Sequence, residues 1–378
     1  MAKRPIFEDV AAPPAGKPTP LPPRGIEAPS GARRAIQAWL WVLFAMVMAM
    51  IAVGGLTRLT GSGLSITEWA PLRGALPPMN AADWQAEFER YRQIDQYRLV
   101  NEGMSLGEFQ VIYWWEWSHR QLGRLMGVVW AVGFLWFWLR KQIPSGWTVR
   151  LLIPGLLGGL QGAIGWWMVH SGLQDGMVAV ASYRLATHLG LAFVILGVLA
   201  WYALMLGRSA SALMKARRSR EAKLFSMSTG LMHFAFLQII LGALVAGIDA
   251  GRGYTDWPLM AGSFLPPAMF ELEPVWRNFF ENDGTVQFIH RMSGYLLAIF
   301  AVVVWMRGRR SAFAQTRRAF QWVLVAMLGQ IVLGIVTVMH GAPVYLGISH
   351  QFMAVLLWVL ILRARLLAQY PLGGTIRG

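Results

Sequence analysis

Eight runs of about 20 mostly apolar residues constrain this chain more than any other feature. They lie at residues 36–57, 118–139, 150–170, 184–207, 227–248, 287–306, 320–340 and 345–366. Each run is long enough to cross the hydrocarbon core of a bilayer as a helix. The chain has 378 residues, of which 56% are apolar and 14% charged. It is therefore predicted to be an all-α polytopic membrane protein, with the lipid bilayer as its surroundings.

The distribution of charge predicts how these helices are oriented. Placing both termini and every second connection on one side of the membrane gathers 23 of the 34 Lys and Arg residues there, with few acidic ones. By the positive-inside rule this side is cytoplasmic, so both termini are predicted to be cytoplasmic. The net charge of +15 is thus explained by the orientation of the chain in the membrane. No basic stripe with interleaved aromatic residues appears, and nucleic acid is not expected as a partner.

The segments outside the spans have distinct compositions. Residues 1–35 are rich in Pro and Ala and are expected to form a disordered cytoplasmic tail without a signal peptide. Residues 208–226 form a basic cytoplasmic linker, and 367–378 a second tail. The outer connection 60–117 carries Trp84, Phe88 and Tyr91 at helical spacing, which indicates amphipathic helices on the membrane face. These helices are either a lid over a site or simply a solvated loop.

The chain also looks duplicated. His119-Arg120 and His290-Arg291 each stand at the mouth of an apolar run, with Gly four residues after the His. Three further matches relate Thr67-Glu68-Trp69 to Thr255-Asp256-Trp257, Gln161 through His170 to Gln330 through His340, and Thr187-His188 to Ser349-His350. Residues 36–207 and 227–366 are therefore predicted to be two four-helix bundles of the same orientation, a parallel repeat.

Histidine is the obvious metal ligand, since the chain has no cysteine. Four of its seven histidines begin the even-numbered spans, two in each predicted bundle: His119, His188, His290 and His350. Paired imidazoles on facing helices are what a haem iron with two axial ligands requires. The alternative is that they are hydrogen-bonded interfacial residues. His170 and His340 are rival ligands, but loop-like residues follow both, which favours a solvated cap or a propionate contact.

Three charged residues and two glycines complete the candidates. Arg120 and Arg291 are candidates for contacting haem propionates, or for reaching water and lipid phosphate. Glu116 lies three residues before His119, on the same helical face, whereas Gln287 stands at the matching place in the second half. The alternative for Glu116 is an ion pair with Arg120 or Arg124. Separately, Gly158 and Gly162 are expected to mark close helix packing.

With these residues in view, the chain resembles the haem A synthase family, in particular its cysteine-free class, over about residues 36–366. The resemblance rests on three stretches: Gly54-Gly55-Leu56-Thr57-Arg58-Leu59-Thr60, Ser62-Gly63-Leu64-Ser65-Ile66-Thr67-Glu68-Trp69, and Glu116-Trp117-Ser118-His119-Arg120 with Gly123-Arg124. It implies an oxidoreductase that converts the C8 methyl group of haem O to a formyl group, yielding haem A for terminal oxidases. Other members of the family have a cysteine pair in the outer loops, which is absent here.

The resemblance further assigns roles to residues. His119 and His188 would ligate the substrate haem, His290 and His350 a resident haem b, and Glu116 would be catalytic. It implies the bacterial inner membrane, with the mitochondrial inner membrane as the alternative. The haem O synthase (protohaem farnesyltransferase) and oxidase assembly factors are candidate partners. The rival functions are a di-haem b membrane electron-transfer protein and a haem carrier without chemistry.

Overall fold

The computed structural model describes residues 30–70 and 73–373, and its regular elements in these ranges are helices. Eight of these helices are long and apolar enough to cross a membrane, which confirms the prediction of an all-α multi-pass membrane protein. They are α1 (Ser30–Leu59), α4 (Leu106–Leu139), α5 (Thr148–Gly172), α6 (Ser182–Leu206), α8 (Ala222–Gly247), α10 (Asp283–Gly308), α11 (Ala314–Met339) and α12 (Val344–Gln369). The predicted tail falls mostly outside the described residues, and its last six residues already belong to α1.

Helix α4 begins well before the predicted span, at Leu106. The Ser105 side chain accepts a hydrogen bond from the Glu108 backbone N–H, while the Glu108 carboxylate accepts from the Ser105 backbone N–H. This capping box starts the helix among polar residues. At 34 residues the helix is about 51 Å long, against a hydrocarbon core of about 30 Å. Its first turns therefore extend beyond the apolar layer.

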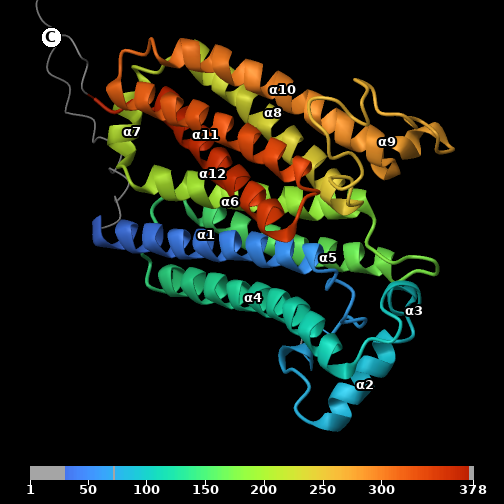
Figure 1. Cartoon of the computed structure of the whole chain (residues 1–378). Coiled ribbons are helices and arrows are strands. Elements are labelled where there is room, and N and C mark those ends of the chain that lie inside the picture. Colours follow the sequence, from blue (N-terminus) through green and yellow to red (C-terminus); the bar gives the residue numbers. More distant parts are fainter. Residues whose placement is uncertain (1–29, 71–72, 374–378) are drawn as a thin grey trace, which may run out of the picture.

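The outer connection folds onto this extension of α4. It contains η1 (Arg73–Ala75), α2 (Ala81–Tyr91) and α3 (Asp95–Val100). Phe88 and Tyr91 of α2 are buried together with Phe109 and Tyr113 of α4. The predicted amphipathic helix is thus confirmed, but its aromatic side packs against α4. Figure 1 shows α2 and α3 beyond the end of the long helices.

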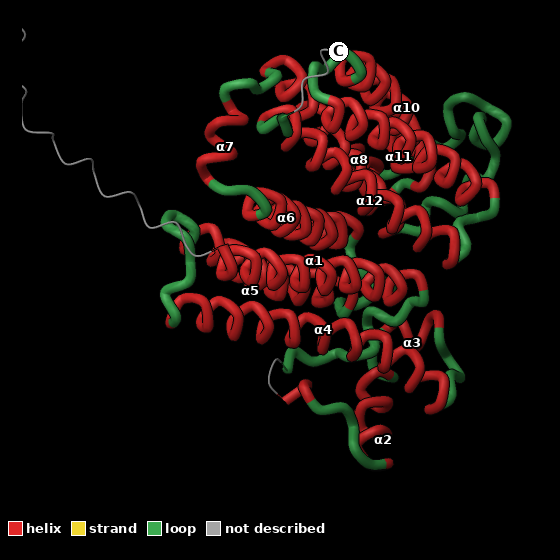
Figure 2. Tube along the Cα trace, turned by 90° about the vertical axis from the view of Figure 1, so that its left-hand side faces the viewer, coloured by secondary structure: helices red, strands yellow, loops and turns green. Residues whose placement is uncertain are grey.

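The membrane-spanning helices form an inner group and an outer group. At the centre, α6 and α12 contact each other, and each also contacts α1 and α8; α4 and α5 lie on one side and α10 and α11 on the other (Figures 1 and 2). Helix α6 is the most enclosed of the eight, because more than half of its most apolar stretch is buried. Gly197 of α6 lets Trp358 of α12 approach, and the Trp358 indole N–H donates to the Phe193 carbonyl at 3.1 Å.

Each half of the chain also closes on itself. In the first half α1 contacts α4, α4 contacts α5, α5 contacts α6, and α6 returns to α1. In the second half α8, α10, α11 and α12 make the corresponding four contacts. A parallel repeat requires these neighbours; the repeat itself stays a prediction. The connection between the halves contains α7 (Ala210–Arg217), and the connection from α8 to α10 within the second half contains η2 (Val275–Arg277) and α9 (Asn278–Glu281).

Candidate functional site

Two of the candidate ligands lie face to face in the first half. The rings of His119 on α4 and His188 on α6 have their centroids 6.5 Å apart, with 56° between the ring planes. Metal–imidazole bonds of about 2 Å on opposite sides of one ion separate two ring centres by roughly 6 Å. The pair therefore has the spacing of two axial ligands. In the second half, His290 and His350 lie near enough for an electrostatic interaction between their rings.

Each of the four histidine rings packs against a glycine of the preceding membrane-spanning helix. A Cβ added to these glycines would lie 2.8 to 3.0 Å from the ring Cε1 atom, closer than the 3.4 Å where ordinary contact begins. The pairs are Gly54 with His119, Gly165 with His188, Gly242 with His290, and Gly334 with His350. Any larger residue would push the ring away, so these four glycines shape the sites. The sequence analysis did not assign them this role.

A glutamine lies beside three of the four rings. In each case the side-chain Nε2 donates to the main-chain carbonyl of the histidine and lies close to its Nδ1. The distances to carbonyl oxygen and Nδ1 are 2.9 and 3.2 Å for Gln161 and His188, 2.9 and 3.1 Å for Gln238 and His290, and 3.2 and 3.3 Å for Gln330 and His350. These residues too were not predicted as part of the site.

Glu116 is buried and fully engaged. One carboxylate oxygen accepts from the Ser65 hydroxyl and the Ile66 backbone N–H, both at 2.8 Å. The other accepts from Nε and Nη2 of Arg120, at 3.1 and 2.7 Å. The ion pair expected as the alternative therefore exists, and it ties the loop after α1 to α4. The carboxylate is 3% exposed, so its charge is held in a largely water-free place.

Gln287, at the matching position of α10, holds its own half's loop without a charge. Its Nε2 donates to the carbonyl oxygens of Ala250 and Tyr254, at 2.8 and 3.1 Å. Its Oε1 is buried and has no hydrogen-bond partner in the described part of the chain. The two halves therefore differ here in the way the sequence analysis expected, with a carboxylate in one and an amide in the other.

The arginines that follow His119 and His290 hold the same loops. Arg120 donates to the carbonyl oxygens of Ile66 and Glu68, at 2.8 and 3.1 Å. Arg291 donates to the carbonyl oxygens of Tyr254 and Asp256, at 2.9 and 3.0 Å. Each guanidinium group thus binds the loop that follows the first membrane-spanning helix of its half. Propionate contacts by these two residues stay a prediction.

Hydrogen bonds within the loop itself also hold the loop that Arg291 contacts, at residues 254–262. The Asp256 carboxylate accepts from the backbone N–H groups of Ala261 and Gly262, both at 2.9 Å. These bonds stabilise the ionised carboxylate and lower the pKa of Asp256 below its ordinary value.

The remaining histidines are exposed and bound within their own segments. His170 lies 3.3 Å from the Gln174 side chain, through its Nε2. The Nδ1 atoms of His233 and His340 lie 2.9 and 2.8 Å from the carbonyl oxygen four residues earlier in each helix. All three are exposed, whereas the four candidate ligands are half-buried. The geometry favours those four over the rivals.

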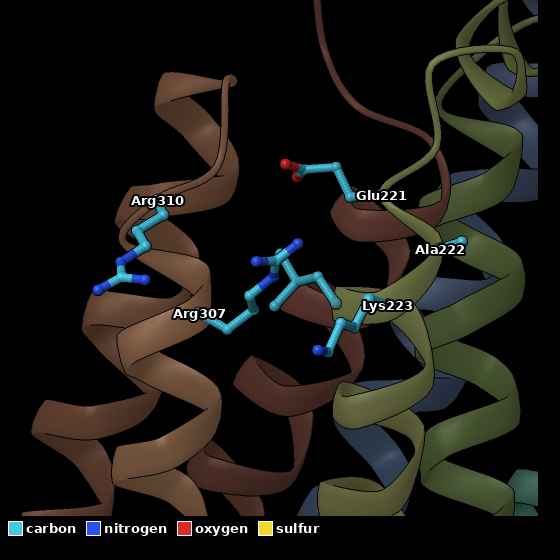
Figure 3. Close-up of a pocket in the computed structure, with 6 residues that line it drawn as sticks. Glu221, Ala222, Lys223, Arg307 and Arg310 are labelled. Carbon is cyan, nitrogen blue, oxygen red and sulfur yellow. The ribbon is translucent and has the colours of Figure 1, made fainter.

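A separate cavity of about 190 Å³ lies at the other end of the second half. Figure 3 shows Lys223 from the start of α8, Arg307 from the end of α10, Arg310 from the turn after it, and Glu221. Arg307 is 17 residues beyond His290 in α10, or about 25 Å along the helix. This basic cavity is thus remote from the histidine pairs.

These features fit a haem group. A haem iron takes four nitrogens from the porphyrin and needs one or two more ligands from the protein, for which imidazole is common. His119 has a buried Nδ1 with no hydrogen-bond partner among the residues that the structure describes, and Gly54 brings the backbone of α1 against its ring. Polar side chains at this depth in a membrane protein are costly and usually serve a function. Iron ligation by the four histidines stays a prediction.

The fold defines a class, that of multi-pass membrane proteins, and its paired histidines have the spacing that a haem iron requires. Residues 37–362 match the model of a family described as cytochrome oxidase assembly proteins. Proteins named haem A synthase are similar over the whole chain, with 64% identity in Ruegeria sp. and 61% in Paracoccus denitrificans, covering 100% and 99% of those relatives. The chain therefore belongs to the haem A synthase family of cytochrome oxidase assembly proteins.

Proposed function

We propose that this protein oxidises the C8 methyl group of haem O to a formyl group and so makes haem A. The single observation that carries the proposal is the 6.5 Å pair of His119 and His188, in a chain 64% identical over its full length to a protein named haem A synthase. A pair of imidazoles positions a haem, and the family supplies the reaction.

The two halves take different haems in this proposal. Residues 36–207, with His119 and His188, bind the substrate haem O. Residues 227–366, with His290 and His350, hold a resident haem b that handles electrons. The difference between Glu116 and Gln287 supports this division, because only the first half has an ionisable side chain beside its first ligand.

The overall reaction fixes what the protein must do. With water as the formal source of oxygen, a methyl group and one water give a formyl group, four protons and four electrons, in two steps of two electrons each. The iron of a bound haem supplies the redox chemistry, and an acceptor outside the chain takes the electrons. The protein ligates the haems, keeps the site enclosed and accepts protons. Glu116 is the catalytic carboxylate proposed for the last task.

The proposed setting follows from the same residues. Arginine and lysine gather on one side of the eight helices, and the similar proteins are bacterial. We place the protein in the bacterial inner membrane with both termini in the cytoplasm. Haem O is poorly soluble in water, which favours direct transfer from the farnesyltransferase that makes it. Oxidase assembly factors are further proposed partners.

Glu116→Gln tests the catalytic assignment, because it removes the charge and keeps the shape. Both haem sites should still fill, while conversion of haem O should fall by about 10²-fold or more or stall at the alcohol. Ser65→Ala is the control, because it removes one hydrogen bond to the same carboxylate and leaves the charge. If both variants slow conversion equally, Glu116 acts only by holding the loop. Near-normal haem A production by Glu116→Gln would exclude it from catalysis.

A further inference from the structure

The glutamine that accompanies three of the candidate ligands is missing beside the fourth. Gln161, Gln238 and Gln330 each precede the glycine under a histidine ring by four residues. The residue four before Gly54, the glycine under His119, is Met50. The pattern of glutamine and glycine thus occurs three times and is broken once.

Met50 takes the place of the absent glutamine in space as well as in sequence. A Cβ on Gly123, four residues after His119, would lie 3.2 Å from the terminal methyl of Met50. A Cβ on Gly294, four residues after His290, would lie 3.2 Å from Nε2 of Gln238. Met50 and Gln238 therefore occupy matching positions, on α1 and α8.

The substitution gives the ring of His119 a thioether in place of an amide. A thioether is at most a weak acceptor and has no N–H to donate. Among the described residues, Nδ1 of His119 is accordingly buried without a hydrogen-bond partner, whereas Nδ1 of each other ring lies 3.1 to 3.3 Å from a glutamine amide. In the second half the amide nitrogens of Gln238 and Gln330 also lie 3.5 and 3.2 Å from Nε2 of His290 and His350.

Each amide N–H donates to the main-chain carbonyl of its histidine and lies against the ring, and an outer contact of this kind fixes the position of a ligating side chain. We propose that Gln161, Gln238 and Gln330 are positioning residues for their histidines, and that Met50 makes His119 the labile axial ligand of the substrate site. The inference rests on the proposed function, because it requires haem between the histidines. It adds that the bond from His119 to the haem iron is the weak one and that Met50 is the residue responsible.

The asymmetry suits the tasks of the two halves. A resident haem must stay bound, and both of its proposed ligands have a glutamine. A substrate haem must enter and its product must leave, and one of its two proposed ligands lacks this support. A single weakened bond lets the site exchange its haem while His188 still positions it.

A reciprocal exchange of the two side chains tests the inference. Carbon monoxide binds reduced six-coordinate haem only after an axial ligand leaves, so its binding rate measures ligand lability without any haem conversion. In the purified full-length protein containing both haems, we expect one rapidly reacting haem population and one slow population. Met50→Gln should slow the rapid phase roughly 10-fold, and Gln238→Met should accelerate the slow phase by a similar factor.

The controls separate this inference from the proposed function. Met50→Leu keeps the volume without an amide and should react like the unchanged protein, which guards against effects of packing. If bis-histidine haem is present and neither exchange alters the carbon monoxide phases by more than twofold, the inference is wrong while the proposed haem sites stand. If the unchanged protein binds no bis-histidine haem, the proposed function fails first and the inference with it.

Discussion

Replacing Gly242 by alanine should expel haem from the second half while leaving its helix intact. The added Cβ would lie 3.0 Å from Cε1 of His290, and ordinary contact begins at 3.4 Å, so the ring must retreat by about 0.4 Å. Metal–ligand distances hold to about 0.2 Å, and the bond to His290 cannot absorb this shift. A disturbed ligand of this kind costs roughly 10- to 100-fold in metal affinity.

The backbone effect of this substitution has the opposite sign. Alanine favours a helix interior over glycine by about 1 kcal/mol, so α8 itself should not be weakened. The assay is the ratio of haem to protein after purification, together with haem loss to an excess of a scavenging acceptor protein. Gly230→Ala in the same helix is the control, because its Cβ would lie at an ordinary 3.4 Å from Phe300. A Gly242→Ala protein with full haem and an unchanged spectrum would refute the proposed ring contact.

Three further predictions concern ligation, pH and topology. His350→Ala should lose the resident haem and His340→Ala should keep it, since His340 bonds its own helix; the reverse pattern by absorption spectroscopy would reassign the ligand. The pKa of Asp256 is lower in the folded loop, so its contribution to stability is present above the ordinary value of 3.8 and is lost as pH falls through the folded value. Amide exchange at Ala261 and Gly262 should accelerate in that window, and Asp256→Asn should remove the pH dependence. Reporter fusions should find the carboxy terminus inside, and an outside terminus would overturn the orientation.

The spans could be predicted because a long apolar run leaves few alternatives to a membrane helix. The start of α4 was not predicted, because its first turns carry polar residues such as Glu108 and Gln110 among aromatic residues that pack against α2. The capping box of Ser105 and Glu108 was the available signal. The burial of Phe88 and Tyr91 against α4 is a tertiary contact, and spacing within one helix does not reveal the partner of its apolar side.

The histidines could be predicted because they are few, polar and repeated, whereas the residues that support them could not. A glycine in an apolar helix suggests close helix packing. Gly158 and Gly162 have no neighbouring atom within 4 Å of an added Cβ in the described part of the chain, so that prediction was wrong for contacts within this chain. Gly165, three residues further on, lies against His188. Only the spacing of glutamine and glycine, compared among the helices, carried the signal.

Glu116 shows a different limit of the sequence. Its place on the face of His119 and its difference from Gln287 could be read directly. Its contacts with Ser65 and Ile66 could not, because they depend on how the loop after α1 folds back onto α4.

Haem extracted from the purified protein tests the central claim most directly. The protein would be produced with and without the farnesyltransferase that makes haem O, and its haem separated by chromatography. We predict haem B in both preparations, and haem A or its alcohol intermediate beside it only when the farnesyltransferase is present. Haem B with unaltered haem O in the second preparation would contradict the proposed oxidation and favour a haem carrier or an electron-transfer protein.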